Sequence, residues 1–205
     1  MKSRRIVCGL VALGLFCGSI PARSEETKAP EQGGADMEAM MKEWAKWANP
    51  SDMHKHLDKM AGNWAVTTKM WMDPSAPPME SKGTARSTFV LGGRWLRQEY
   101  TGDMMGMPFE GIGMIGYDNF RKEFISTWID NFSTTMTRTT GSCNETGTEF
   151  KMIGTMDEPI TGERDKKFRH VWTLTSADSH VFEAYDNIPG KGEVKVMELT
   201  YTRVK

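Results

Sequence analysis

The chain has 205 residues, enough for one domain and too few for two comfortable ones. Its 26 basic and 27 acidic residues nearly balance, and they form no clustered basic stretch of the kind that binds nucleic acid. The sequence contains no P-loop, no G-x-S-x-G and no H-E-x-x-H, so these motif-based enzyme classes are excluded.

Residues 1–24 have the pattern of a secretory signal peptide. Three basic residues near the start precede an apolar run that is shorter than the roughly 20 residues needed to span a bilayer. Ala22 and Ser24 are small residues at the two positions that a signal peptidase reads, so we expect cleavage near Ser24. Export to the periplasm or the medium would follow. A lipoprotein anchor at Cys17 is the weaker alternative, because the bulky Phe16 precedes that cysteine.

Cleavage near Ser24 would take four of the 26 basic residues and none of the 27 acidic ones, leaving a net charge of about −5. Two of the three cysteines would leave with the signal, and Cys143 alone cannot form an internal disulfide. A metal site built from several cysteine thiolates is excluded for the same reason.

Two segments precede the main domain. Residues 25–35 are rich in Glu, Gly, Pro and Lys and are predicted to form a disordered linker. Residues 36–61 are predicted to be a helical lead-in of one or two short helices. The first would run from Asp36 to Ala48 and be stopped by Asn49-Pro50, and its apolar stripe comprises Met37, Met40, Met41, Trp44 and Trp47 or Ala48. The second would be capped by Ser51, and its apolar face comprises Met53, Leu57 and Met60. We expect both stripes to be packing surfaces.

From residue 62 to residue 205, β-branched and aromatic residues alternate with polar ones in runs separated by turn signals. Ten strands are predicted, near residues 63–72, 82–91, 94–102, 108–117, 122–130, 133–142, 148–156, 166–175, 179–186 and 194–203. Short connections make neighbouring strands antiparallel, and closure removes the exposed edges of so wide a sheet. We therefore predict a mainly β fold, a closed up-and-down antiparallel barrel with room for a cavity.

The start of the first predicted strand carries a short motif. Gly62-Asn63-Trp64 resembles the opening of lipocalins and related small barrels. In those families the Trp plugs one barrel end, and a basic residue of the last strand lies over it. Arg203 is the matching residue here, so the resemblance implies a barrel-end pair of Trp64 and Arg203. A guanidinium over an indole contributes about 0.5–2 kcal/mol.

Longer runs carry a second resemblance. The stretches Gly92–Asn119, Ser126–Asn131 and Val194–Arg203 are similar to the bacterial family known as domain of unknown function 1579. The similarity extends from about Met53 to the C-terminus. It implies a lipocalin-like, calycin-type barrel, and it supplies no established activity or catalytic residue.

A charged cluster is the first candidate for ligand binding. If Trp95 points into the barrel, strand alternation places Arg97 and Glu99 in the cavity as well. Because buried charges must be paired, these two and Glu110 would then form a paired cluster able to meet a ligand head group. The alternative places Trp95 on the outside under the helices, with Arg97 and Glu99 as solvated surface charges.

Apolar residues complete the candidate cavity lining, namely Met107, Phe109 and Trp128. Trp128 shares a strand face with Ser126 and Asp130. The Thr-rich run 133–142 can supply hydroxyls to a polar lumen, although threonine also suits a solvated strand.

Metal and cofactor sites are only weakly indicated, and the sequence identifies no cofactor. Met104, Met105 and Met107 cluster in one hairpin, where thioethers can hold Cu(I) or simply pack adaptably. His54 and His56 lie two apart on a helix and face different directions. We expect structural or surface roles for His170 and His180, whereas haem binding would need an axial ligand such as one of these histidines.

Three functional hypotheses follow. The first is an exported barrel that binds a small, mostly apolar ligand. The second, an enzyme, uses Arg97, Glu99 and Glu110 for proton transfer inside the barrel. The third is a structural or interaction protein that docks through its N-terminal helices, and exposure of Met40 and Trp44 with Trp47 would favour it. Copper or haem binding is a minor alternative.

Overall fold

The computed structural model describes residues 32–159 and 161–205, so the expected signal peptide and residues 25–31 of the expected linker lie outside the described residues. The ten strands are β1 (Gly62–Met70), β2 (Met79–Val90), β3 (Trp95–Met104), β4 (Met107–Asp118), β5 (Glu123–Asp130), β6 (Thr137–Cys143), β7 (Glu149–Glu158), β8 (Glu163–Ser176), β9 (Ser179–Ile188) and β10 (Gly192–Arg203). All ten predicted strands are therefore present.

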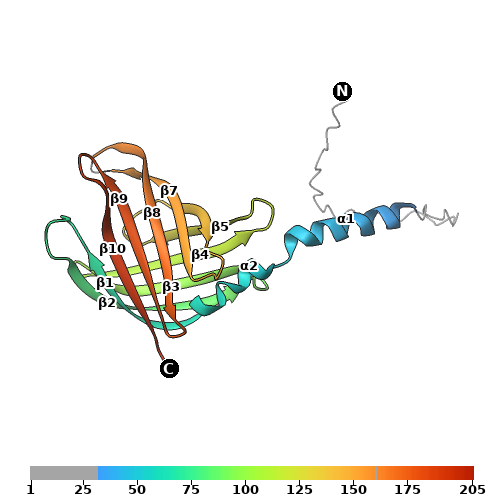
Figure 1. The fold of residues 1–205 in the computed structure, drawn as a ribbon, viewed down its shortest axis with the longest axis horizontal. Coiled ribbons are helices and arrows are strands. Elements are labelled where there is room, and N and C mark those ends of the chain that lie inside the picture. Colours follow the sequence, from blue (N-terminus) through green and yellow to red (C-terminus); the bar gives the residue numbers. More distant parts are fainter. Residues whose placement is uncertain (1–31, 160) are drawn as a thin grey trace, which may run out of the picture.

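The strands close into a barrel in which each pairs antiparallel with its neighbours in sequence (Figure 1). Closure occurs between the first and last strands, where Trp64 of β1 lies opposite Arg203 of β10. This architecture confirms the predicted closed up-and-down barrel. The tight turn between β2 and β3 contains Gly92 and Gly93 at φ values of 66° and 83°, a region in which glycine avoids the strain of a side chain.

β6 shows the largest difference from the predicted strand bounds, because it begins at Thr137 rather than near residue 133. The Asp130 carboxylate accepts hydrogen bonds from the backbone N–H groups of Phe132 and Ser133, at 2.9 and 3.1 Å. These bonds hold the chain in a turn after β5, and a backbone engaged in this way is not free to join the ladder.

The barrel interior holds two clusters of buried apolar side chains. The first lies next to the helical lead-in and comprises Leu57, Met60, Leu96, Ile115, Phe124, Phe150, Met152 and Leu174. The second comprises Trp64, Val66, Ala85, Tyr100, Phe109 and Tyr201. Alternation along each strand directs the strand residues of both clusters inward, whereas Leu57 and Met60 are contributed by the helical lead-in.

The barrel end at Trp64 is closed by packing and by a cation over an indole. Trp64 is buried, and its Nε1 donates to the carbonyl of Met60 at 3.1 Å. The Arg203 guanidinium lies over the indole with Cζ 4.2 Å from the ring centroid. Arg203 also donates hydrogen bonds to the carbonyls of Lys59, Ala61 and Ala177. Two of these carbonyls belong to the end of the lead-in and the third to the β8–β9 turn, so Arg203 ties both segments to the last strand.

His180 lies beneath this end of the barrel. Its ring stacks on Tyr201 with centroids 4.2 Å apart and meets Trp64 edge to face at 4.4 Å. Neither ring nitrogen has a hydrogen-bond partner among the described residues. Burial, together with the nearby Arg203 charge, lowers the pKa of His180 to about 4. The imidazole is therefore neutral at neutral pH.

The short helices α2 (Asp52–Lys55) and η1 (Asp58–Met60) cover the same end. Leu57 and Met60 are buried in the first core cluster, and Met53 packs against it. The expectation that this second stripe is a packing surface is therefore confirmed. His54 is buried beside Tyr117, and its Nδ1 accepts a hydrogen bond from the Ser51 backbone at 3.0 Å.

The first helix, α1 (Gln32–Ala48), begins four residues before the predicted start at Asp36, so part of the expected linker is helical. It projects away from the barrel (Figure 1). Its apolar stripe is exposed, and the expectation that this stripe packs within the chain is wrong. The reason lies at the helix C-terminus, where Arg94 Nε donates to the Ala48 carbonyl at 2.7 Å and Asn119 donates to the Trp47 carbonyl at 3.2 Å. These barrel residues hold the helix end at the rim and direct it outward.

Candidate functional site

The barrel encloses a cavity of about 430 Å³. Its lining extends from Met60 at the helix-covered end to Phe132 and Ser133 of the β5–β6 loop at the opposite end. The volume falls within the range of about 300–1,000 Å³ that is typical of small-molecule pockets. Protein interiors are otherwise close-packed, so unfilled space of this size is a feature of the fold that needs an explanation.

Most of the wall is apolar and aromatic. The apolar lining side chains include Leu96, Met104, Phe109, Ile115, Trp128, Phe132, Met156, Phe168, Trp172, Phe182, Met197 and Leu199. Phe109 stacks on Trp128 at a centroid distance of 6.4 Å and meets Phe132 at 5.3 Å. Gly111 and Gly113 leave room for the Trp128 indole, because a Cβ on Gly111 would lie 2.1 Å from that ring.

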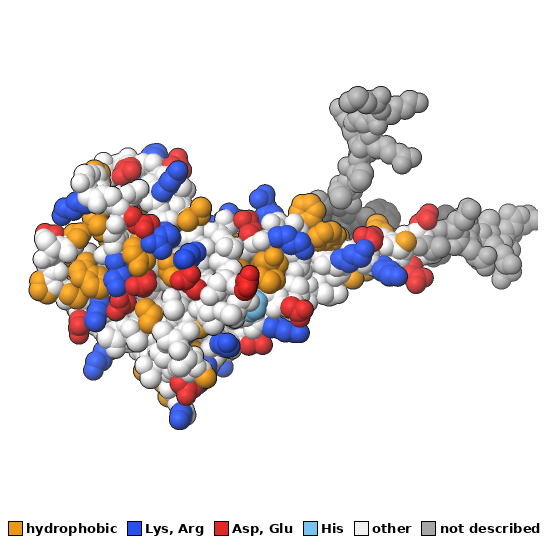
Figure 2. Space-filling model, viewed as in Figure 1, with side chains coloured by type: hydrophobic (Ala, Val, Ile, Leu, Met, Phe, Trp, Pro, Cys, Tyr) orange, Lys and Arg blue, Asp and Glu red, His pale blue; other side chains and the backbone are white. Residues whose placement is uncertain are grey.

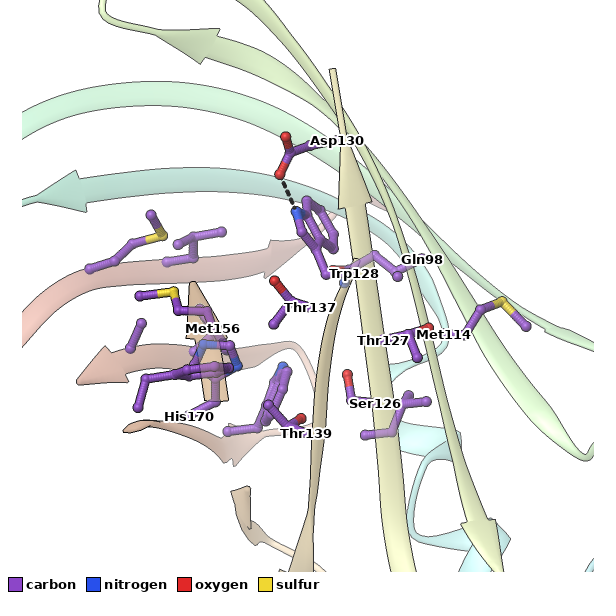
Figure 3. Close-up of a pocket in the computed structure, with 18 of the residues that line it drawn as sticks. Gln98, Met114, Ser126, Thr127, Trp128, Asp130, Thr137, Thr139, Met156 and His170 are labelled. Carbon is purple, nitrogen blue, oxygen red and sulfur yellow. Dashed lines mark hydrogen bonds between the residues drawn. The ribbon is translucent and has the colours of Figure 1, made fainter. Parts of the chain in front are cut away.

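A hydroxyl-bearing strip crosses this wall on β5 and β6. Ser126 lies opposite Thr139, and Trp128 lies opposite Thr137, so all four share the inner face (Figure 3). The hydroxyl of Thr139 is buried and has no hydrogen-bond partner among the described residues. The Trp128 indole N–H donates to the Asp130 carboxylate at 3.0 Å. The strip can therefore orient a polar group of a ligand without itself carrying charge.

His170 supplies the imidazole of this cavity. It lies on β8 between Met152 and Ala184 of the neighbouring strands, and Figure 3 places it beside Met156. Phe168 and Phe182 contact its ring, with centroids 4.7 and 4.9 Å away. Burial lowers its pKa to about 4, so the ring is neutral at neutral pH. A neutral imidazole offers one N–H donor and one acceptor, and His170 makes no hydrogen bond with the described residues.

The charged side chains of the lining are already paired. Asp186 accepts a hydrogen bond from Lys166 Nζ at 2.6 Å, and this bond raises the pKa of Lys166. Asp130 accepts the Trp128 indole N–H and two backbone N–H groups. Among the described lining residues no cation is left over to neutralise an anionic head group. The chemistry of the cavity therefore favours an uncharged ligand.

The structure places the predicted lining residues in two different environments. Phe109 and Trp128 line the cavity, whereas Met107 lies in the exposed end of the β3–β4 hairpin. Trp95 points outward toward the helical lead-in, where it lines a smaller hollow with Trp47 and His54. Sequence alternation alone did not separate these two groups.

The charged cluster predicted inside the barrel is on the outside. Leu96 and Gln98 face the cavity, so the pleat directs Arg97 and Glu99 to the outer surface. There Arg97 forms an ion pair with Glu99 at 2.6 Å, and both side chains are more than two-fifths exposed. Glu110 is exposed as well. The prediction of a charged cluster inside the cavity is therefore wrong. The enzyme hypothesis loses the three side chains on which it depended.

Charged side chains of both signs are mixed on the face of the barrel in view. Figure 2 shows blue and red side chains interspersed over the barrel face in view, in agreement with the absence of a basic footprint in the sequence. No helix of the described residues is both long and apolar enough to cross a membrane.

Metal sites find limited support in the geometry. Within the described residues, no group of three or more His, Cys, Asp or Glu side chains is arranged to hold a metal ion. Of the three clustered methionines, Met104 lines the cavity, while Met105 and Met107 are exposed. Among the four histidines, His170 alone belongs to the cavity lining. Copper and haem binding stay predictions.

Sequence reasoning missed His170, Gln98 and Ser87 as cavity residues. Gln98 Nε2 donates to Ser87 Oγ at 3.3 Å, and the Gln98 carbonyl faces the Tyr201 hydroxyl at 3.5 Å. A usable signal was present for His170, because it alternates in register with the apolar Phe168 and Trp172. A residue in phase with an inward aromatic set is inward too.

Comparison with known proteins defines the family. No curated protein matches the chain. The crystal structure of Rv2717c from M. tuberculosis is similar to it, with a TM-score of 0.57 and 12% sequence identity over 77% of this chain and 100% of that one. A redesigned β-barrel gives a TM-score of 0.37 with 16% identity, over 73% of this chain and 96% of that one. The family model described as protein of unknown function (DUF1579) matches residues 49–203. The chain therefore belongs to the DUF1579 family.

Proposed function

We propose that the barrel binds a small, mostly apolar and uncharged ligand in its central cavity. The observation that carries this proposal is the cavity of about 430 Å³, walled by aromatic side chains and containing an imidazole that makes no hydrogen bond with the described residues. Apolar walls with a few polar groups that converge on one point are typical of ligand sites. The ligand's apolar body would contact Phe109, Trp128 and Phe182, and its polar group would meet His170 and the hydroxyl strip.

The absence of a free cation in the described lining supports a neutral ligand. A carboxylate or phosphate placed inside would lie near Asp130 and Asp186 without a compensating positive charge. An alcohol, amide, ketone or phenol can form hydrogen bonds with a neutral imidazole and with hydroxyls without the cost of burying an uncompensated charge. The ligand's polar group is therefore neutral in this proposal.

Displacement of an apolar fluorescent dye tests the site. The chain should bind such a dye, and Ala184→Phe should abolish binding because it fills the cavity beside His170. Thr155→Phe is the matched control, since it adds the same ring on the exposed face of β7. Equal dye binding by both variants would show that the dye sits elsewhere and would remove the support for a cavity ligand.

We also propose that the protein acts outside the cytoplasm. The basic, apolar and small-residue pattern of residues 1–24 supports this placement. N-terminal sequencing of the protein from its host tests it, with a start near Glu25 expected. Recovery of a cytoplasmic chain that still begins at Met1 would overturn the proposal.

A further inference from the structure

The aromatic side chains of the cavity wall form two separate clusters. The β4–β5 cluster comprises Phe109, Trp128 and Phe132. The β8–β9 cluster comprises Phe168, Trp172 and Phe182, which surround His170. Ring centroids that are in contact within each cluster are 4.7–6.4 Å apart. No ring contact within the described part of the chain joins one cluster to the other.

The two clusters lie on opposite walls of the barrel. Four strands separate β4 from β9 in either direction around the sheet, so these two strands are diametrically opposite. The space of the cavity therefore lies between two sets of aromatic rings. An apolar cavity of about 150 Å³ holds one benzene molecule. The cavity of about 430 Å³ thus has room for a system of about two or three fused rings.

Two polar groups that lack hydrogen bonds lie beside the β8–β9 cluster (Figure 3). Gly154 of β7 lies between Thr139 of β6 and Phe168 of β8 in one cross-strand row. A Cβ built on Gly154 would lie 2.8 Å from Phe168 Cζ and 3.0 Å from Thr139 Cγ2, so the ring and the threonine come together over the glycine. The His170 ring contacts the same phenylalanine at a centroid distance of 4.7 Å. The Thr139 hydroxyl and the His170 imidazole, which make no hydrogen bond with the described residues, are therefore neighbours of one aromatic ring.

We propose that the ligand is a flat aromatic alcohol, a phenol built on about two or three fused rings. This inference rests on the proposed function, because it names the class of molecule that the same cavity binds. The ring system lies between the β4–β5 and β8–β9 clusters, where it gains ring–ring contacts in addition to the burial of apolar area. Its hydroxyl donates to the acceptor nitrogen of the His170 imidazole and accepts from the Thr139 hydroxyl. A phenol is uncharged at neutral pH because its pKa is about 10, which agrees with a lining whose charges are already paired.

Comparison of a flat probe with its saturated analogue tests the ring system. Equilibrium dialysis of the full chain, produced in an exporting bacterium, measures the Kd for 2-naphthol and for decahydro-2-naphthol. The two probes share a carbon skeleton and a hydroxyl, and 2-naphthol should bind about tenfold more tightly. Phe182→Leu should lower this preference about threefold or more, because it removes one ring from the wall. Phe120→Leu is the matched control, since Phe120 is exposed on the β4–β5 turn, and it should leave the preference unchanged.

A probe without a hydroxyl tests the polar contact. The ratio of the affinities for 2-naphthol and 2-methylnaphthalene should fall about fivefold or more in His170→Phe, because only 2-naphthol has a hydroxyl that is left unpaired. His56→Phe makes the same exchange on the lead-in, where the His56 ring lies against Gly147, and should leave the ratio unchanged. Each ratio compares two probes on one variant, so partial unfolding of a variant weakens both affinities equally and does not change the ratio.

The outcomes separate this inference from the proposed function. Equal affinity for 2-naphthol and decahydro-2-naphthol, with both lost in Ala184→Phe, would overturn the aromatic class and still support a cavity ligand. A 2-naphthol to 2-methylnaphthalene ratio that His170→Phe leaves intact would overturn the assigned hydroxyl contact. If none of the three probes binds, or if Ala184→Phe leaves their binding intact, both the inference and the proposed function lose their support.

Discussion

Acidification is expected to destabilise the barrel because His180 is buried in its neutral form. Its imidazole lies between Trp64 and Tyr201, neither ring nitrogen has a hydrogen-bond partner in the described part of the chain, and its pKa is about 4. His180→Phe is the informative change. It keeps an aromatic ring between the same neighbours and removes the group that takes up a proton.

The sign and the size of this pH effect follow from the linkage between proton binding and folding. An unfolded histidine has a pKa of 6.5, so between pH 6.5 and about pH 4 the unfolded chain binds more protons than the folded one. The stability that neutral His180 contributes is complete above pH 6.5 and is lost as pH falls toward 4. Each pKa unit corresponds to about 1.36 kcal/mol, so acidification to about pH 5 costs about 2 kcal/mol for this residue. His170, with the same pKa, adds a similar loss.

Urea unfolding at about pH 7.5 and about pH 5, followed by tryptophan fluorescence, measures the effect. The free energy of unfolding of the natural chain should fall between the two pH values by about 2 kcal/mol more than that of His180→Phe. At the higher pH the variant should be at least as stable as the natural chain, because it removes buried polar atoms without partners. Identical pH dependence in the two chains would refute the assignment of a depressed pKa to His180.

Further substitutions test other parts of the fold. Arg203→Ala should lower the free energy of unfolding by about 2–4 kcal/mol, because it removes the cation over the Trp64 indole and leaves three carbonyls without their donor. Thermal denaturation measures this loss of stability, and a loss below about 0.5 kcal/mol would contradict the role of Arg203 in closing the barrel end. Neutralising the outer-face pair with Arg97→Gln and Glu99→Gln should change both stability and dye affinity by less than about 1 kcal/mol. A large loss of dye binding would show that these two residues take part in ligand binding. Gly111→Ala should displace the neighbouring indole and cost about 1–3 kcal/mol, visible as a shift in tryptophan emission.

The strands were predictable because their signal is local. Alternating apolar and polar residues with short turns locate a strand whatever lies across from it. Closure of the barrel was predictable from the number of strands, because an open sheet leaves unpaired backbone groups along its two edge strands. The first residues of β6 were missed because a side-chain interaction, the Asp130 carboxylate with two backbone N–H groups, replaces the ladder there.

The inner face of β3 was not predictable from the strand alone. Each face mixes large and polar residues: Trp95 with Arg97 and Glu99 on one, and Leu96 with Gln98 and Tyr100 on the other. The choice is made by the neighbours, because Leu96 lies across from Phe89 of β2 and Ile115 of β4, whose faces line the interior. Register across three strands is a property of the folded sheet. The direction of α1 was beyond the sequence for the same reason, since Arg94 and Asn119 act on it from distant turns.

Native mass spectrometry of the protein purified gently from its own host tests the central claim most directly. A ligand-carrying barrel should show an added mass that is released on denaturation, and the Ala184→Phe chain should show none. Recovery of the bare polypeptide from the host, together with a crystal structure in which side chains fill the space around His170, would contradict the proposal that this barrel carries a ligand.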